Sequence, residues 1–222
     1  GSVATDHLMT IPGIFADSIV AGSIENISLS FLVDELDIRR GGVGANITFG
    51  MGVLGLAPIL IGAVGRDWDD YNSWLTRHGV DTSSVKVSKT QLTASFTVTT
   101  DKELNQIASF YPGAMSEARD IELGPIIDKY GGIDLVVIAP DNPDAMVRHT
   151  KECRHRGVDF ATDPSQQLAR LDGEVIKTLI DGAKYLFLNE YEMALALHKT
   201  GWSEAEVLDR VEMRVITRGS KG

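Results

Sequence analysis

A run of glycines followed by an asparagine is the part of the sequence best suited to hold a small molecule. Residues 41–48 read Gly-Gly-Val-Gly-Ala-Asn-Ile-Thr, and an apolar stretch with helical character follows. Glycines lack a Cβ, so a ligand can approach their backbone, and a helix N-terminus presents N–H groups without a partner in the helix. The side chain of Asn46 both donates and accepts hydrogen bonds. This combination suits a small molecule with several hydroxyl groups.

Two better-known glycine-rich motifs do not fit this run. A phosphate-binding Walker loop ends in Lys followed by Ser or Thr, and neither residue stands there. A dinucleotide fingerprint needs Gly-x-Gly-x-x-Gly, but counting from Gly42 places Ile47 at the third glycine. A tight turn with close helix packing remains the structural alternative to a ligand site.

Composition narrows the class of protein. The chain has 222 residues, of which 43% are hydrophobic, enough for one large domain or one domain with a small appendage. The net charge is −10 and no Lys/Arg run occurs, so we expect no nucleic-acid partner. Cys153 is the single cysteine, which excludes an intrachain disulfide and favours a cytoplasmic location. No apolar run is long enough to span a bilayer, and no signal-peptide pattern opens the chain.

Strand-like and helix-like segments alternate through the central and C-terminal parts of the chain. Strands are expected at 59–64, 134–139, 158–162, 185–188 and 213–217. Helices are expected at 142–156, opened by Asn142 and Pro143, at 174–183, at 190–199 and after a Ser203/Glu206 capping box. This alternation predicts an α/β fold, a parallel sheet with helices on both faces. Ligands bind beyond the carboxyl ends of such strands, where polar clusters stand at 163–167, 189–192 and 218–222.

Two segments break the alternation. Residues 19–36 mix Ser, Ile and Leu with acids, and residues 84–112 alternate polar and apolar side chains around a turn-like Asp101-Lys102. We interpret both as antiparallel hairpins of a small second sheet, a β lid over the first. Because hairpin edges carry unpaired backbone groups, a homodimer through the lid is expected.

These residues together resemble the ribokinase-like (PfkB) family of kinases. The glycine cluster with Asn46, Thr48, Gly55 and Gly65 fits the whole spacing of that family's first signature. Residues 28–34, 107–119 and 163–171 are similar to adenosine kinases of the actinobacterial type. The resemblance implies one ribokinase-like α/β domain over 1–222, with lid strands at about 7–36 and 84–112 inserted. It also implies ATP-dependent phosphorylation of the 5′-hydroxyl of adenosine, a purine-salvage reaction.

The resemblance also assigns substrate-binding residues. Ser2 and Asp6 are expected at the end of the first strand, with Asp6 accepting hydrogen bonds from the ribose 2′- and 3′-hydroxyls. Gly42 and Asn46 complete the ribose site. Lid residues Phe96 and Phe110 pack on the base, since aromatic stacking suits a purine. The remaining substrate residues are Ser30, which is expected to reach the partner subunit's site, and Gln166, Gln167 and Arg170.

ATP and Mg²⁺ are the cofactors that the resemblance implies. Asn189 and Glu192 match the family's Asn-x-x-Glu motif, which positions Mg²⁺, often through water, and hard oxygen ligands are what Mg²⁺ prefers. Thr217, Gly219 and Gly222 resemble the start of the nucleotide-binding loop. Each group has a structural alternative: the Asn189/Glu192 spacing is that of an ordinary helix cap, the Phe pair can be lid core, and Asp6 can be a cap.

The family's second signature, Asp-Thr-x-Gly-x-Gly-Asp, does not occur in the sequence. Its last Asp is the general base and its glycines open a helix that stabilises the transferring phosphoryl group. We therefore expect no catalytic residue within the chain, a base beyond Gly222, a first strand clipped at Gly1-Ser2, and at most trace turnover with nucleoside binding retained. Two alternatives stay open: a sugar kinase of the same family, for ribose or fructose, and a non-catalytic nucleoside-binding or dimerisation fragment.

Overall fold

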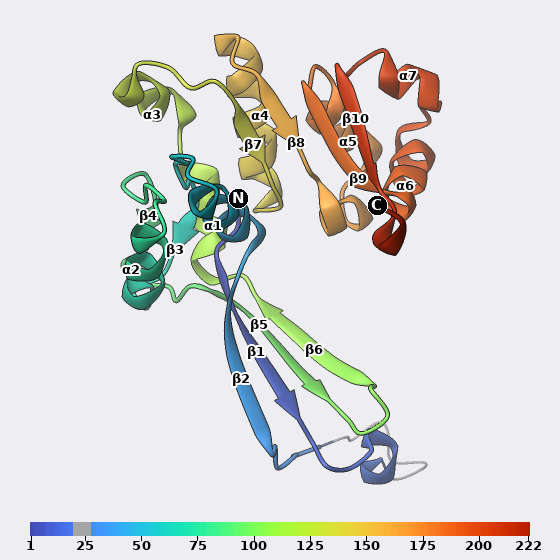
Figure 1. The fold of residues 1–222 in the computed structure, drawn as a ribbon. Helices are drawn as coiled ribbons and strands as arrows, with labels where there is room; N and C mark the ends of the chain where they lie inside the picture. The colour runs from blue at the N-terminus through green and yellow to red at the C-terminus, as the bar shows by residue number, and fades with distance from the viewer. Residues whose placement is uncertain (20–27) are drawn as a thin grey trace.

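A long four-stranded lid projects from a larger α/β body in the computed structural model, which describes residues 1–19 and 28–222 (Figure 1). The lid consists of β1 (Ala4–Thr10), β2 (Glu35–Gly41), β5 (Ala94–Thr100) and β6 (Gln106–Tyr111). Their order in the sheet is β2-β1-β5-β6. The N-terminus lies in the middle of the molecule, where the lid meets the body (Figure 1).

The body contains a four-stranded parallel sheet in the order β10-β9-β8-β7. Its strands are β7 (Val136–Ile138), β8 (Phe160–Thr162), β9 (Tyr185–Asn189) and β10 (Met213–Thr217). The connecting helices are α4 (Pro143–Arg156), α5 (Gly173–Ile180) and α6 (Glu190–Thr200), followed by α7 (Glu204–Leu208). Short 3₁₀ helices η4 (Ser165–Ala169) and η5 (Gly219–Lys221) follow β8 and β10. The predicted alternation of strands and helices is thus confirmed.

The N-terminal half of the body is built around two short strands, β3 (Ala63–Val64) and β4 (Lys86–Val87), which pair in parallel. Its helices are α1 (Val43–Val53), α2 (Asp69–Arg77) and α3 (Leu123–Tyr130), with 3₁₀ helices η1 (Phe15–Ser18) near the lid tip and η3 (Gly113–Asp120). Phe49 stacks on Trp74 with ring centroids 4.1 Å apart, and Trp68 is buried in the same core. Trp68 and Trp74 thus hold α2 against this core.

Strand boundaries in the N-terminal half differ from those predicted. The expected strand at 59–64 is reduced to β3 and an isolated bridge between Ile59 and Asp81. Within the expected lid segments, residues 28–34 form no strand, β2 begins only at Glu35, and β4 pairs with β3 instead of joining the lid. The part of the predicted segment at 20–27 lies outside the described residues. Local alternation marked these residues as extended, but strand pairing depends on distant partners.

The lid sheet is mixed instead of purely antiparallel. β1 pairs antiparallel with β2, and β5 pairs antiparallel with β6, but β1 and β5 run parallel in the centre. Two hairpin-like halves are therefore joined through the first strand of the chain. Asp6 consequently lies inside β1, and Ser2 precedes that strand, whereas both were expected at a strand end.

Helix caps fix the elements around the parallel sheet. Asn142 Oδ1 accepts hydrogen bonds from the N–H of Asp144 and Ala145 at 3.0 and 3.3 Å, and Pro143 occupies the first helical position of α4. Ser203 and Glu206 form the predicted capping box of α7. The larger hydrophobic core packs α3 to α7 against this sheet and includes Phe160, Ile176 and Leu186. Among residues 1–19 and 28–222, every helix is too short or too polar to cross a membrane.

Candidate functional site

The glycine turn before α1 requires glycine at position 42. Gly42 has φ +91°, and a Cβ built on it would lie 2.6 Å from the carbonyl oxygen of Ser2. Both the backbone angle and the close approach exclude a side chain. Asn46 stands in the first turns of α1, where its N–H donates to the Gly42 carbonyl at 2.9 Å and its side chain is exposed. The turn therefore presents Asn46 to solvent on a rigid backbone.

Ser2 closes the N-terminus of α1. Its Oγ accepts a hydrogen bond from the N–H of Val43 at 3.1 Å, and its carbonyl accepts one from Ala45 at 3.2 Å. These two N–H groups at the start of α1, which were expected to be available to a ligand, therefore already donate to Ser2. The buried hydroxyl of Ser2 thus positions the glycine turn. No short-range pattern predicts this contact, because residues 2 and 43 are far apart in the chain.

Strand register gathers three of the predicted substrate residues on one face of the lid. Asp6 in β1 lies opposite Phe96 in β5, and Phe96 lies opposite Phe110 in β6. Directly opposite residues in a sheet point to the same face. Arg39 in β2 completes this row on the other side of Asp6. The row therefore combines a carboxylate with two aromatic rings, of which Phe96 is half-buried and Phe110 is exposed.

The row lies beside the glycine turn. The carboxyl group of Asp6 lies over Gly41, where a Cβ would be 2.5 Å from Asp6 Oδ2. Tyr71 donates a hydrogen bond from its hydroxyl to the Gly41 carbonyl at 2.9 Å, which fixes this residue from the body side. Burial raises the pKa of Asp6, and the neighbouring His7 partly opposes the shift. A half-buried carboxylate in this position is well placed to accept hydrogen bonds from hydroxyl groups.

A second set of polar residues lines the carboxyl edge of the parallel sheet. Asp141, Asp163, Asn189 and Thr217 stand at or just after the ends of β7, β8, β9 and β10, which are neighbours in that order. The carboxyl edge is where ligands bind on sheets of this type. Thr217 is exposed, as are Gly219 and Gly222, which adopt positive φ in and after η5.

Asn189 and Glu192 form a reciprocal capping box at the start of α6. The N–H of Glu192 donates to Asn189 Oδ1, and the N–H of Asn189 donates to Glu192 Oε2, both at 2.8 Å. Asn189 and Glu192 therefore form the ordinary helix cap that was the structural alternative for this spacing. It does not exclude a role in binding, because Glu192 Oε1 takes no part in the box.

Asp163 was missed as a site residue. Burial first, and then the charge of Glu192, raise the pKa of the Asp163 carboxyl to about 6. The next residue but one, Ser165, adopts φ +45°, which is uncommon outside glycine and often found at functional sites. The sequence feature that could have identified Asp163 as a site residue is its position directly after a buried strand. Two carboxylates that repel one another at a strand edge favour a bound cation.

A hydrogen bond and an ion pair connect this edge to the residues before the glycine turn. Gln167 in η4 donates from Nε2 to the Asp141 carbonyl at 3.1 Å, and the Asp141 carboxylate lies 3.4 Å from the amino group of Gly1, next to Ser2. The structure thus brings Gln167 near α1, while Gln166 and Arg170 are exposed on the same turn. Ser30 is exposed next to Phe31, which packs on Phe15 at the far end of the lid. No described contact brings Ser30 to the rest of the site.

The sequence and the fold correspond to a known family of enzymes. The family model described as pfkB family carbohydrate kinase matches residues 8–222, so the chain belongs to this family. The structure of Burkholderia thailandensis nucleoside kinase in complex with inosine is 36% identical, has a TM-score of 0.83 and covers 100% of this chain and 70% of that one. The same protein has been solved in complex with ADP-inosine.

Two archaeal relatives carry the same description. The nucleoside kinase of Methanocaldococcus jannaschii is 28% identical over 184 residues, which make up 82% of this chain and 59% of that protein. The nucleoside kinase of Methanothermobacter thermautotrophicus is 29% identical over 156 residues, 69% of this chain and 50% of that protein. The chain thus spans between half and three fifths of these curated relatives. The ribokinase-like α/β fold predicted from the sequence is confirmed.

Proposed function

We propose that this chain supplies the nucleoside-binding part of an ATP-dependent nucleoside kinase that phosphorylates the 5′-hydroxyl of a purine nucleoside, with adenosine and inosine as the first substrates to test. The row of Asp6, Phe96 and Phe110 beside the glycine turn is the observation that supports this most strongly. A ribose needs hydrogen-bond acceptors and a purine needs flat apolar surface, and one lid face offers both. The relatives described as nucleoside kinases support the same class of substrate.

Within this proposal Asp6 accepts hydrogen bonds from the 2′- and 3′-hydroxyls, and Asn46 contacts the ribose from α1. Phe96 and Phe110 cover the base, with Gln166, Gln167 and Arg170 at the rim formed by η4. Ser2 acts indirectly, by holding the N-terminus of α1 through Val43. Ser30, at the far end of the lid, contributes only if a second copy of the chain brings it to that copy's site.

Mg²⁺ and ATP fit the carboxyl edge of the parallel sheet. Asp163, Glu192 and Asn189 offer hard oxygen atoms, the type that Mg²⁺ binds directly or through water. When bound, Mg²⁺ would neutralise charge on the phosphates of ATP. Thr217, Gly219 and Gly222 would approach the nucleotide through their backbone, since glycine allows close contact.

Ligand titration tests the proposal directly. Calorimetry with inosine, adenosine and ribose should give saturable binding of both nucleosides to this chain, and ribose should bind at least about 10-fold more weakly because it leaves Phe96 and Phe110 uncovered. Binding of ribose alone would favour the sugar-kinase alternative. Binding without turnover, even in a longer chain that carries the Asp-Thr-x-Gly-x-Gly-Asp motif, would favour a binding module.

Asp163→Asn should stabilise the protein at neutral pH and weaken Mg²⁺ binding. Because the pKa of the Asp163 carboxyl is raised in the folded protein, protonation of this group favours folding. This contribution to stability is fully present below pH 3.8 and is lost as the pH rises through about 6. Because the side chain is partly exposed, we expect a gain of only about 1 kcal/mol at pH 8, or about 2–4 °C in Tm. No gain is expected at pH 4, where the carboxyl group is largely protonated.

Thermal melts of both proteins at pH 4 and pH 8, with and without Mg²⁺, measure this effect. Mg²⁺ should stabilise the wild type more than the variant. Asp209→Asn changes an exposed carboxylate at the end of α7 and serves as the matched control. Equal stabilisation of the wild type and Asp163→Asn by Mg²⁺ would contradict the cation site, and equal melting temperatures at pH 8 without Mg²⁺ would contradict the raised pKa of Asp163.

We also propose a homodimer through the lid. Leu36, Ile38 and Ile107 are 54%, 58% and 51% exposed, and their register places them on the lid face opposite to Asp6. Sedimentation at micromolar concentration should give a dimer, and Leu36→Lys with Ile38→Lys should convert it to a monomer, since buried lysines are costly. Asp37→Lys, on the other face between them, should remain dimeric. A monomeric wild type would refute this interface.

A further inference from the structure

The side chain of Lys199, in the last turn of α6, is held by three backbone carbonyl groups. Its ammonium group donates to the carbonyl of Leu168 at 2.7 Å and to those of Ala169 and Leu171 at 2.8 Å. A lysine ammonium has three donors and no acceptor, so this one uses all of its donors on one short stretch of backbone. Lys199 itself lies outside the residues proposed to bind nucleoside, ATP or Mg²⁺.

The three carbonyl groups lie at the end of η4 and directly after it. The last carbonyl groups of a helix have no N–H partner within the helix. Among the described residues, no backbone N–H donates to the carbonyl of Leu168, Ala169 or Leu171. A lysine side chain is a suitable partner for such carbonyl groups. Lys199 therefore satisfies this end of η4 from a neighbouring helix.

The backbone of Lys199 is itself fixed. A Cβ on Gly173, the first residue of α5, would collide with the Lys199 carbonyl, so α5 starts directly against the end of α6. The next residue, Thr200, is buried, and its hydroxyl donates to the Ala196 carbonyl at 2.7 Å. The start of α6 is closed by its capping box. Lys199 thus extends toward η4 from a helix that is held at both ends.

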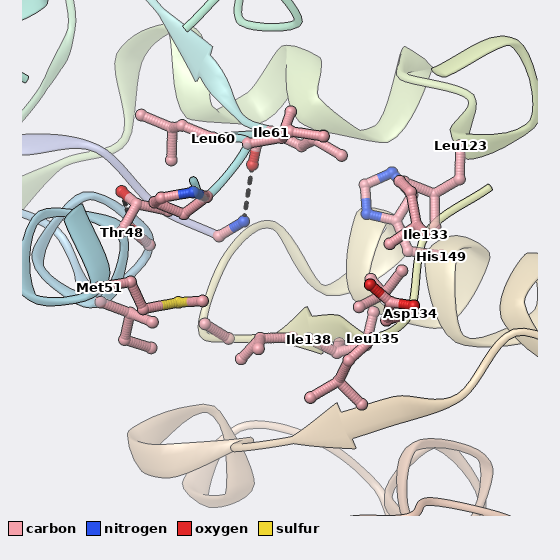
Figure 2. A pocket seen from close by; sticks show the side chains of 18 of the residues that line it. Thr48, Met51, Leu60, Ile61, Leu123, Ile133, Asp134, Leu135, Ile138 and His149 are labelled. Carbon is pink, nitrogen blue, oxygen red and sulfur yellow. Dashed lines mark hydrogen bonds between the residues drawn. The ribbon is translucent and has the colours of Figure 1, made fainter. Parts of the chain in front are cut away.

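A short helix such as η4 needs attachments of this kind. It spans 5 residues, Ser165–Ala169, and so short a run forms few hydrogen bonds of its own. The amide of Gln167 ties it to the loop after β7, because Nε2 donates to the Asp141 carbonyl at 3.1 Å. Asp141 also belongs to the lining of the apolar cavity shown in Figure 2. Lys199 provides the second polar attachment, at the other end of η4.

The backbone that Lys199 holds carries two of the residues at the proposed nucleoside rim. Gln166 lies within η4 and Arg170 directly follows it, and both are exposed. The backbone of η4 therefore sets where these two side chains stand. Groups that are ordered before a ligand binds lose less conformational freedom on binding, which strengthens affinity.

We propose that Lys199 is a positioning residue of the nucleoside site, which holds η4 so that Gln166 and Arg170 are in place before the nucleoside binds. This role rests on the proposed function, in which these two side chains stand at the rim of the site. Lys199 touches no ligand and acts only through the backbone of η4. Since α6 also begins at Asn189, near the proposed Mg²⁺ position, one helix supports both binding regions.

Calorimetry with inosine tests this role when the ammonium group is replaced. Lys199→Met keeps the length of the side chain but removes its donors, and it should weaken inosine binding about 10-fold. Lys199→Arg, which still donates to carbonyl groups, should stay within about 3-fold of the wild type. Lys177→Met is the matched control, because Lys177 is also partly buried, on α5, but donates to Glu174 at 2.8 Å. It should bind inosine like the wild type.

Two further measurements separate positioning from a general loss of stability. Amide exchange at Gln167 and Arg170 should become faster in Lys199→Met and not in Lys177→Met, because their N–H groups close the turns of η4. In a background with Gln166→Ala and Arg170→Ala, Lys199→Met should weaken binding less than about 3-fold further, since the side chains through which it acts are absent. Lys199→Gln, which keeps a neutral donor, replaces the Met variant if that protein melts below the assay temperature.

Unchanged exchange in Lys199→Met would show that Lys199 does not hold η4. Faster exchange with unchanged inosine affinity would limit Lys199 to a structural role. An equal loss of affinity with and without the side chains of Gln166 and Arg170 would show that Lys199 does not act through the rim. Absence of inosine binding in the wild type would refute the proposed function, and faster exchange in Lys199→Met would then still support the hold of Lys199 on η4.

Discussion

Gly42→Ala is expected to unfold the glycine turn and abolish nucleoside binding. A residue with a Cβ is strained at φ +91°, and this Cβ would meet Ser2 and Val3 at 2.6 Å. Backbone strain and steric overlap each cost about 1–3 kcal/mol, so we expect a loss of about 3 kcal/mol and a fall in Tm of about 6–12 °C. Thermal melts and inosine calorimetry measure both effects.

Gly50→Ala is the matched control, in the same helix. A Cβ on Gly50 has open space around it, and its φ is not positive. Alanine at this position should raise the stability by about 0.5–1 kcal/mol, because glycine weakens a helix interior. A Gly42→Ala variant as stable as Gly50→Ala would show that the turn is not constrained as described.

Asp6→Asn is expected to weaken nucleoside binding about 100-fold to 1,000-fold while the protein stays folded. Hydrogen bonds from hydroxyl groups to a carboxylate contribute about 1.5–3 kcal/mol each, and the proposed ribose contact contains two. The amide keeps the shape of the carboxyl group, and burial already disfavours the charge of Asp6. Asp37→Asn, on the same lid face one row away, should bind normally.

A 2′,3′-dideoxynucleoside separates this contact from an indirect effect. It should bind the wild type about as weakly as the ribonucleoside binds Asp6→Asn, and the variant should not distinguish the two ligands. Binding to the wild type should also fall on acidification from a higher pH than for an exposed aspartate, because the pKa of Asp6 is raised by burial. A variant that still prefers the ribonucleoside would remove Asp6 from the ribose site.

Local chemistry made several elements predictable. Asn142 with Pro143, and Ser203 with Glu206, were identified as helix starts because a side-chain oxygen and its N–H partner lie within three residues of each other. The strand ends that carry Asp163 and Asn189 were located because buried strands are unbroken apolar runs. The glycine turn was recognised because only glycine tolerates the backbone of position 42.

Contacts between distant residues were not predictable in this way. The parallel pairing of β1 with β5, which aligns Asp6 with Phe96, is set by the register between two strands whose paired residues are 90 positions apart. Two further contacts depend on which strands become adjacent. One is the hydrogen bond from the N–H of Val43 to Ser2 at the start of α1. The other is the approach of Glu192 to Asp163, which adds to the effect of burial in raising the pKa of Asp163. The predicted strand at 59–64 was shortened for the same reason, because a strand is defined by its partners.

The sequence by itself determined the kind of site: glycines that admit a ligand to the backbone, one amide on the following helix, and polar residues where buried strands end. Side-chain type and short-range spacing carry that information, since helix caps and turns are closed by neighbours in the chain. Only the tertiary structure decided which residues share a face and which hydrogen-bonding groups are already used. Those properties arise from sheet register and burial, which depend on the whole chain packing around one core.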